Sequence, residues 1–263
     1  MGCGVSQSEM KPEENATVSD LERIIGGTRV PSQTKYPWMA WLRNAQYEFI
    51  CGGALINDRY VLTAAHCVFW SPTGSFTVTL GDLDRSTPDE SESIQIPARA
   101  IIHPQYDTPT WLNNDVALLK LETPLNFSAF PHIRPICLSS GVNPDVGTNV
   151  TISGWGRFLG SEPDLSEELL EATVYVISQE TCRNKYGLFI NSNFICAQST
   201  ESNICLGDSG GPLMHRTLTG FYYSAGIVSF VKSEACPVEY GAGFARTASM
   251  RFRASSQLFF GEE

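Results

Sequence analysis

Short apolar runs separated by polar turns dominate the chain from Ile24 onward, and long stretches with a helical apolar period are scarce. Several runs combine β-branched and aromatic residues and are flanked by Gly, Pro, Ser or Asp, a pattern that predicts β-strands. The clearest are Phe76–Leu80, Asn149–Ile152 and Ser224–Phe230. We predict two short helices, one near Ser178–Tyr186 and one in the tail beyond Ser249. The fold class is therefore all-β, and the local pattern alone fits a sandwich or barrels.

The first 23 residues differ from the rest because they are polar and contain the run Pro12-Glu-Glu-Asn15. Such a composition is typical of a flexible leader. We therefore divide the chain into a leader, residues 1–23, and a folded domain, residues 24–263. No stretch approaches the roughly 18 consecutive apolar residues that a membrane helix requires, and the leader lacks the apolar core of a signal peptide.

Composition and charge narrow the functional classes. The 263 residues can bury a substantial core, and the balance of 42% hydrophobic and 17% charged residues is that of a globular protein. The formal net charge of -10 repels nucleic-acid phosphates and anionic membranes on average. We therefore expect neither a nucleic acid nor a membrane as a partner.

Eight cysteines are an even number, which favours disulfides. The cysteines could instead bind zinc, but the sequence contains no CxxC pair, which zinc sites commonly have. Three sequons for N-glycosylation begin at Asn15, Asn126 and Asn149. Together these features indicate a secreted, extracellular protein.

The N-terminal run Met1–Ser6 fits the template for myristoylation, with Cys3 as a candidate for palmitoylation. That interpretation makes the protein a membrane-anchored cytoplasmic one. We favour a disulfide for Cys3, because without it seven cysteines leave one unpaired in an apparently secreted chain.

Three motifs carry candidate chemistry. The string Gly207–Pro212 places Ser209 among glycines, which permit strained dihedral angles and a close approach of substrate; alone, it could be an ordinary glycine-rich turn. Thr63–Cys67 sets His66 beside a cysteine after an apolar run. Asn113–Leu121 sets Asp115 at the mouth of an apolar strand, where a carboxylate needs hydrogen-bonding partners.

In the order His, Asp, Ser, these strings resemble the chymotrypsin-like serine endopeptidases. Further matching strings are Ile24–Gly27, Cys51–Ile56, Ser153–Gly156, Gly226–Ser229 and Gly243–Arg246. The resemblance implies two packed six-stranded antiparallel barrels with the catalytic residues in the cleft between them. The predicted fold therefore consists of these two barrels and the two short helices named above.

The resemblance also implies a role for each catalytic residue. Ser209 attacks the scissile carbonyl, His66 transfers the proton and Asp115 orients the imidazole. The backbone N–H groups of Gly207 and Ser209 form the oxyanion hole. By the same resemblance, an arginine-preferring protease cuts after Arg23, and the new ammonium group of Ile24 pairs with Asp208 and shapes that loop. The uncut chain is then a nearly inactive zymogen.

Disulfide pairing follows from the resemblance residue by residue. The implied pairs are Cys51 with Cys67, Cys182 with Cys196, Cys205 with Cys236, and Cys3 with Cys137. Val150 and His215 occupy the places of a further family bridge, so His215 is expected to be structural.

The specificity pocket departs from the trypsin-like pattern. Asn203 stands where trypsin-like members have an aspartate, and an amide cannot neutralise a buried cation. The other implied pocket positions are Ile204, Ser229, Val231 and Ala242. Their side chains predict a shallow apolar pocket for small or medium uncharged residues on the amino side of the cut bond.

Asp82, Glu90 and Glu92 could surround a calcium ion, although we favour a solvated acidic loop and expect neither metal nor cofactor. The expected partners of this monomer are protein or peptide substrates, the activating protease and protein inhibitors. The alternative function is that of a catalytically silent homologue that binds or regulates other proteins.

Overall fold

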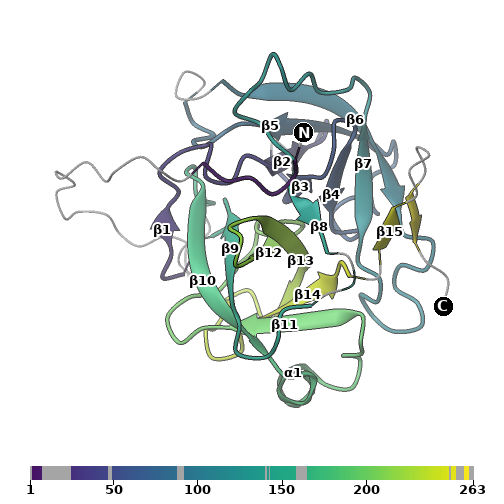
Figure 1. Cartoon of the computed structure of the whole chain (residues 1–263). Coiled ribbons are helices and arrows are strands. Elements are labelled where there is room, and N and C mark those ends of the chain that lie inside the picture. The colour runs from purple at the N-terminus through teal and green to yellow at the C-terminus, as the bar shows by residue number, and fades with distance from the viewer. Residues whose placement is uncertain are drawn as a thin grey trace, which may run out of the picture.

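The computed structural model describes residues 2–7, 25–46, 49–87, 92–139, 141, 143–157, 165–248, 250–252 and 258–260. Most of the predicted leader lies outside these residues, as does Ile24, so the predicted cleavage site Arg23-Ile24 is not described. The described residues form two β-barrels that lie against each other (Figure 1).

Six antiparallel strands close the first barrel, in the spatial order β2-β3-β4-β7-β6-β5. Their bounds are β2 Met39–Arg43, β3 Cys51–Leu55, β4 Tyr60–Thr63, β5 Ser75–Leu80, β6 Ile94–Ile102 and β7 Ala117–Leu121. Leucines such as Leu42, Leu55 and Leu80 are fully buried inside it. Their removal from water drives the closure of the sheet.

Six further strands close the second barrel in the order β9-β10-β11-β14-β13-β12, with β12 pairing back to β9. They are β9 Asn149–Gly154, β10 Leu170–Ile177, β11 Phe194–Gln198, β12 Pro212–Arg216, β13 Tyr222–Val231 and β14 Ala242–Arg246. Two short strands extend it: β1 Thr28–Arg29 beside β10, and β8 Cys137–Leu138 parallel to β13. The predicted all-β fold with two six-stranded barrels is thus confirmed.

A shared apolar cluster joins the barrels. Leu62 and Leu118 of the first barrel pack with Ile227 and Ala245 of the second. The two barrels therefore share part of their core, and residues at the seam between them are held in a fixed relative position.

The predicted short helix near Ser178 is present as α1, Gln179–Tyr186. It begins where the Ser178 side chain accepts a hydrogen bond from the Thr181 N–H, and it ends at Gly187, whose φ of 104° suits glycine. None of the described helices is long and apolar enough to cross a membrane.

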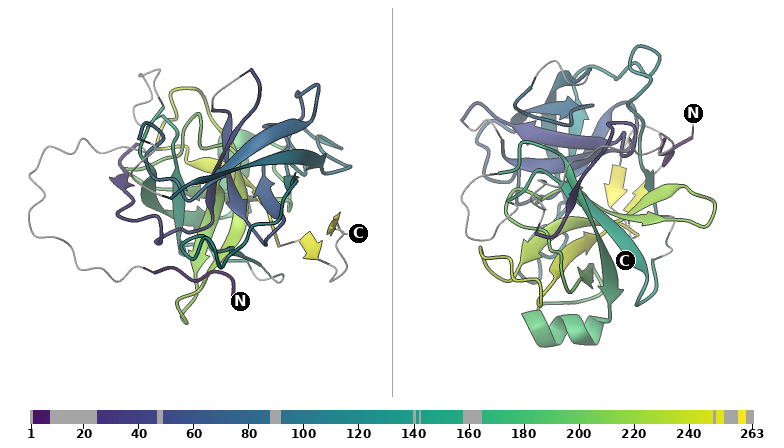
Figure 2. Two further views of the ribbon diagram at one scale, coloured as in Figure 1. Left: turned by 90° about the horizontal axis from the view of Figure 1, so that it is seen from above. Right: turned by 90° about the vertical axis from the view of Figure 1, so that its left-hand side faces the viewer.

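The predicted C-terminal helix is wrong. The described part of the tail contains strands β15 Met250–Phe252 and β16 Leu258–Phe260, which pair antiparallel near the C-terminal end (Figure 2). Each strand is only three residues long and contains phenylalanine, which favours a pleated strand. Neither run is long enough to repeat an apolar helical period.

Four disulfides join the pairs that the resemblance implies. Cys205–Cys236 ties the Ser209 segment to the segment before β14, while Cys3–Cys137 ties the start of the leader to β8. The Cys3 thiol is therefore already bonded, which argues against its use as a palmitoylation site.

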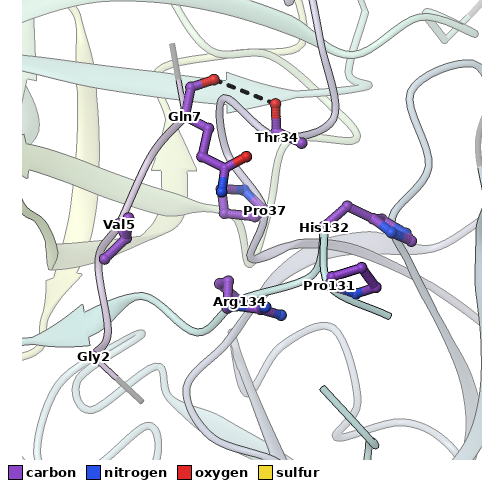
Figure 3. A pocket seen from close by; sticks show the side chains of 8 residues that line it. All are labelled: Gly2, Val5, Gln7, Thr34, Pro37, Pro131, His132 and Arg134. Atoms are coloured by element: carbon purple, nitrogen blue, oxygen red, sulfur yellow. Dashed lines mark hydrogen bonds between the residues drawn. The ribbon is translucent and has the colours of Figure 1, made fainter. Parts of the chain in front are cut away.

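Residues 2–7 of the leader run along both barrels. The Gly4 N–H donates to the Pro135 carbonyl (2.8 Å), and the Gly4 carbonyl accepts from the Tyr222 N–H (2.8 Å). The Gln7 N–H donates to the Thr34 carbonyl (2.9 Å). Between this segment and the first barrel lies a small groove of about 180 Å³ (Figure 3). We call residues 2–7 the leader strap.

Candidate active site

His66 and Asp115 meet where two paired strands of the first barrel end. Thr63 of β4 lies opposite Ala117 of β7, so the residues just after β4 and just before β7 lie close together. The His66 ring nitrogen Nδ1 lies 2.7 Å from Asp115 Oδ2, and the His66 backbone N–H donates to Asp115 Oδ1 (2.9 Å). Two hydrogen bonds to one buried carboxylate hold the imidazole with its Nδ1–H toward Asp115 and leave Nε2 as the acceptor.

Ser229 supplies a third hydrogen bond, which the sequence analysis did not predict. Its hydroxyl donates to Asp115 Oδ2 at 2.5 Å, from strand β13 of the other barrel. Asp115 is fully buried, and an ionised carboxylate is tolerated there because such donors replace water. The sequence signal that could have indicated this bond is Ser229 itself, a hydroxyl residue within the apolar run Gly226–Phe230.

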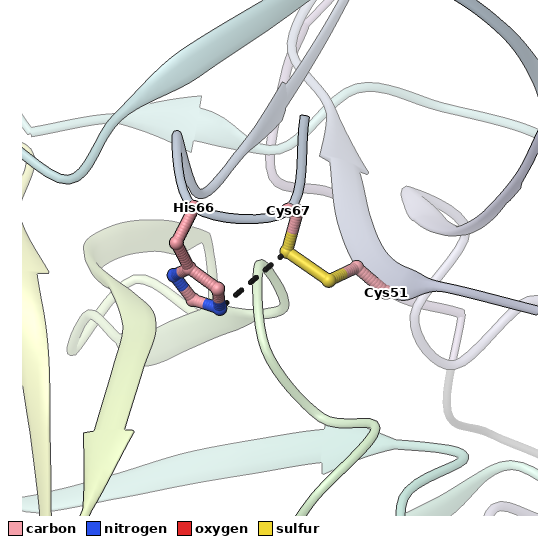
Figure 4. A group of neighbouring side chains, drawn as sticks. All are labelled: Cys51, His66 and Cys67. Atoms are coloured by element: carbon pink, nitrogen blue, oxygen red, sulfur yellow. Dashed lines mark hydrogen bonds between the residues drawn. A yellow bond between two sulfur atoms is a disulfide. The ribbon is translucent and has the colours of Figure 1, made fainter. Parts of the chain in front are cut away.

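The other ring nitrogen, His66 Nε2, faces the disulfide Cys51–Cys67 and lies 3.7 Å from Cys67 Sγ (Figure 4). This grouping resembles a metal site by distance alone. Both sulfur atoms are bonded to each other, however, so no thiolate is present to bind a metal. We therefore interpret the disulfide as a support for the turn that carries His66.

Ser209 lies on a loop that is hydrogen-bonded to both barrels. The Gly52 N–H donates to the Ser209 carbonyl (2.8 Å), and the Gly210 N–H donates to the Val228 carbonyl (2.9 Å). Gly210 has a φ of 83°, and a Cβ there would lie 2.3 Å from Thr63 Oγ1. Only glycine fits this position, which explains why the motif around Ser209 needs it.

The Leu206–Gly207 peptide is also oriented by a hydrogen bond. The Leu206 carbonyl accepts from the Arg157 N–H at 2.9 Å. Since C=O and N–H point in opposite directions in a trans peptide, the Gly207 N–H faces away from Arg157.

Asp208, next to Ser209, is buried at 1% exposure. Its Oδ1 accepts from the Gly156 N–H (2.8 Å) and its Oδ2 from the Cys205 N–H (2.9 Å). Burial raises the pKa of Asp208 to about 6, although these two hydrogen bonds act in the opposite direction. A buried carboxylate with a raised pKa is a ready partner for a cation.

The described start of the folded domain lies near this loop. Ile25 forms an isolated bridge with Asn203, whose N–H donates to the Ile25 carbonyl (3.1 Å). Arg23 and Ile24, the predicted activation residues, lie outside the described residues.

A pocket of about 310 Å³ brings predicted site residues from both barrels together. Its lining comprises His66, Ile204, Cys205, Leu206, Ser209, Val228, Ser229, Phe230, Val231, Ser233 and Glu234. It thus joins His66 and Ser209 to three of the predicted pocket residues, namely Ile204, Ser229 and Val231. Sequence reasoning missed Leu206, Val228, Phe230 and the two residues after Lys232.

Asn203 and Ala242 are not among the lining residues. Asn203 Nδ2 donates to the carbonyls of Cys236, Pro237 and Gly241, each at 3.2 Å, while its Oδ1 accepts from the Ile204 N–H (3.0 Å). Both polar atoms of the Asn203 side chain are therefore hydrogen-bonded to neighbouring backbone groups. Ala242 is buried within β14.

Comparisons with known proteins agree with this geometry. The Trypsin family model matches residues 24–251. The chain belongs to the trypsin family.

Among curated relatives, this trypsin-family chain is 34% identical to serine proteinase stubble of Drosophila melanogaster, over 79% of its own length and 28% of that protein. It is also 34% identical to ovochymase-2 of Mus musculus, over 87% of its own length and 38% of that protein. The chain thus spans well under half of these relatives.

Among solved structures, it matches neuropsin, described as a serine protease expressed in the limbic system of mouse brain. The TM-score is 0.71 and the identity 31%, covering 84% of this chain and 94% of neuropsin. Together the matches identify a serine endopeptidase domain.

Two of the three candidate calcium ligands have other contacts in this trypsin-family domain. Asp82 Oδ2 accepts from the indole N–H of Trp41 (2.8 Å), and burial raises the pKa of Asp82. The carboxylate of Glu92 lies 4.0 Å from His132 Nδ1. Glu90 lies outside the described residues, so the calcium hypothesis stays open.

The remaining predicted residues are the three candidate glycosylation sites and His215. Asn126 and Asn149 are exposed, whereas Asn15 lies outside the described residues. His215 stacks on Tyr223 with ring centroids 5.0 Å apart, and burial lowers the pKa of His215.

Proposed function

We propose that the chain, once cut after Arg23, is a secreted serine endopeptidase that hydrolyses peptide bonds through an acyl-enzyme. One observation carries this proposal: His66 is bonded to the buried Asp115 through Nδ1 and lines the same pocket as Ser209. Ser209 and His66 thus come from different barrels but line one pocket.

In this mechanism Ser209 Oγ attacks the substrate carbonyl while His66 Nε2 takes the hydroxyl proton. His66 then protonates the leaving amine, and the acyl-enzyme is hydrolysed by water with the same base. Asp115 stabilises the imidazolium, and its bond from Ser229 keeps the carboxylate oriented. The N–H groups of Gly207 and Ser209 stabilise the oxyanion.

Activation follows from the environment of Asp208. A buried carboxylate gains most from a buried cation, and the ammonium group that cleavage after Arg23 creates on Ile24 is such a cation. The bridge of Ile25 with Asn203 supports this role, because it places Ile25, the first described residue of the domain, beside the segment that leads to Asp208. Pairing would lower the pKa of Asp208 and hold the loop in one shape. An arginine-preferring protease is the proposed activator.

The pocket favours small or medium uncharged residues on the amino side of the cut bond. Ile204, Val228 and Val231 supply apolar walls. Asn203 carries no charge that could neutralise a substrate cation, its amide is hydrogen-bonded to backbone, and it does not line the pocket. Four disulfides support secretion into an oxidising compartment.

The test of catalysis is covalent labelling with a phosphonylating serine reagent after cleavage at Arg23. We expect the label on Ser209 and none in a Ser209→Ala control, with much slower labelling of the uncut chain. A cut, folded protein that stays unlabelled would contradict the proposal and favour the silent homologue.

The test of specificity is a cleavage profile on a peptide library, again with the cut protein. We expect Ala, Val or Leu before the cut bond. A profile dominated by Arg or Lys would contradict the proposed pocket.

A further inference from the structure

Phe230, a wall residue of the catalytic pocket, lies directly over a glycine of the neighbouring strand. Phe230 of β13 pairs with Gly243 of β14. A Cβ on Gly243 would lie 2.0 Å from Phe230 Cζ and within 2.5 Å of two further ring carbons. Carbon atoms in contact normally lie about 3.5–4.0 Å apart. The ring therefore occupies the space that any side chain at position 243 would need.

From this contact we infer that Gly243 is a specificity-determining residue, because it keeps the Phe230 ring recessed from the catalytic pocket. This inference rests on the proposed function and deepens it. An aromatic ring packed on a cross-strand glycine also covers the exposed backbone of that glycine.

Other rings restrict where Phe230 could move. Its centroid lies 5.0 Å from Tyr186, 5.4 Å from Phe189, 5.6 Å from Phe194 and 6.2 Å from Trp111. Phe230 is itself 7% exposed and lines the pocket that holds His66 and Ser209. The pocket is the open space beside the ring, so a ring displaced from Gly243 moves into it.

The same strand couples this wall to the catalytic residues. The pairing of β13 with β14 is irregular between Val228 and Phe230. Ser229, at this irregularity, donates to Asp115, while the next residue covers Gly243. The wall and the triad are therefore positioned by one short stretch of backbone.

The experiment measures kcat and KM of the cut protein on four peptide amides that have Ala, Val, Leu or Phe before the cut bond. For Gly243→Ala we expect the loss in kcat/KM to grow with residue size, to about tenfold or more for Phe and mainly through KM, because a pocket discriminates by volume. The Ala substrate should change by about twofold or less, and Ser209 should be phosphonylated at nearly the wild-type rate.

Two further variants separate this role from a loss of stability. In Gly226→Ala the new Cβ meets Ile195 Cγ2 and Phe244 Cβ, each at 2.9 Å, away from the pocket lining. This control should affect all four substrates equally. Adding Phe230→Leu to Gly243→Ala removes ring volume and should restore cleavage of the Phe substrate.

An equal loss on all four substrates in Gly243→Ala, or no recovery in the double variant, would overturn the role of Gly243. A wild-type protein that is cut and folded but unlabelled at Ser209 would overturn the proposed function, and this role with it.

Discussion

Asp208 is a buried carboxylate with no ion-pair partner among the described residues, so its ionisation makes the stability of the protein depend on pH. Its pKa of about 6 in the folded chain exceeds the ordinary value of 3.8. Between these two values the folded chain keeps a proton that the unfolded chain has lost. Stability therefore falls as pH rises through this window, and above it the penalty is complete, on the order of 2 to 3 kcal/mol.

We predict that the uncut wild-type protein gains stability relative to an Asp208→Asn variant when pH is lowered from 7 to 4. The comparison cancels other titrating groups, such as His103, whose pKa is lowered to about 4 by burial and which acts in the opposite direction. Urea unfolding at several pH values measures the difference. A difference that does not vary with pH would show that Asp208 does not titrate in this range.

At the scale of elements, the described helix illustrates how a local signal succeeds. Ser178 was predicted near the start of a helix, and its hydroxyl lies 3.0 Å from the Thr181 N–H. A disulfide joins Cys182 of this helix, which is fully buried, to Cys196 of β11. The cap determines where α1 begins, and the disulfide holds it on the second barrel.

We predict that Ser178→Ala lowers the free energy of unfolding by about 1 kcal/mol, because one helical N–H loses its acceptor. Ser178→Asp should retain most of the stability, since aspartate also caps helices. Chemical denaturation of the three proteins makes the comparison. Equal losses in both variants would mean that the cap is not the reason.

At the scale of the whole molecule, the leader strap connects parts that are far apart in the sequence. Cys3 is bonded to Cys137, 134 residues away, and Gly4 is hydrogen-bonded to Pro135 and Tyr222. Cleavage after Arg23 would therefore leave the strap attached both covalently and through its backbone hydrogen bonds.

We predict that replacing Cys3 and Cys137 with serine lowers the free energy of unfolding by roughly 2 to 4 kcal/mol. After cleavage at Arg23, the leader of this variant should separate from the domain during gel filtration, whereas the wild-type leader should stay attached until reduction. Labelling of Ser209 should persist in both. A leader that remains bound in the variant would show that the strap's hydrogen bonds suffice.

The sequence by itself determined the all-β class, the helix near Ser178 and the residue types of the catalytic strings. Such features depend on local backbone preferences and on chemistry that few residues can perform. With the family resemblance, it also determined the two barrels and the four disulfide pairs. The tail helix was wrong because aromatic runs favour strands once a neighbouring strand is available, as β16 is for β15.

Only the tertiary structure decided which distant partners the side chains contact. The bond from Ser229 to Asp115 spans 114 residues, and the turning of the Asn203 amide toward Gly241 spans 38. The packing of Phe230 on Gly243 likewise needs the pairing of β13 with β14. Local pattern carries no information about such partners, because each contact exists only after distant strands have packed together.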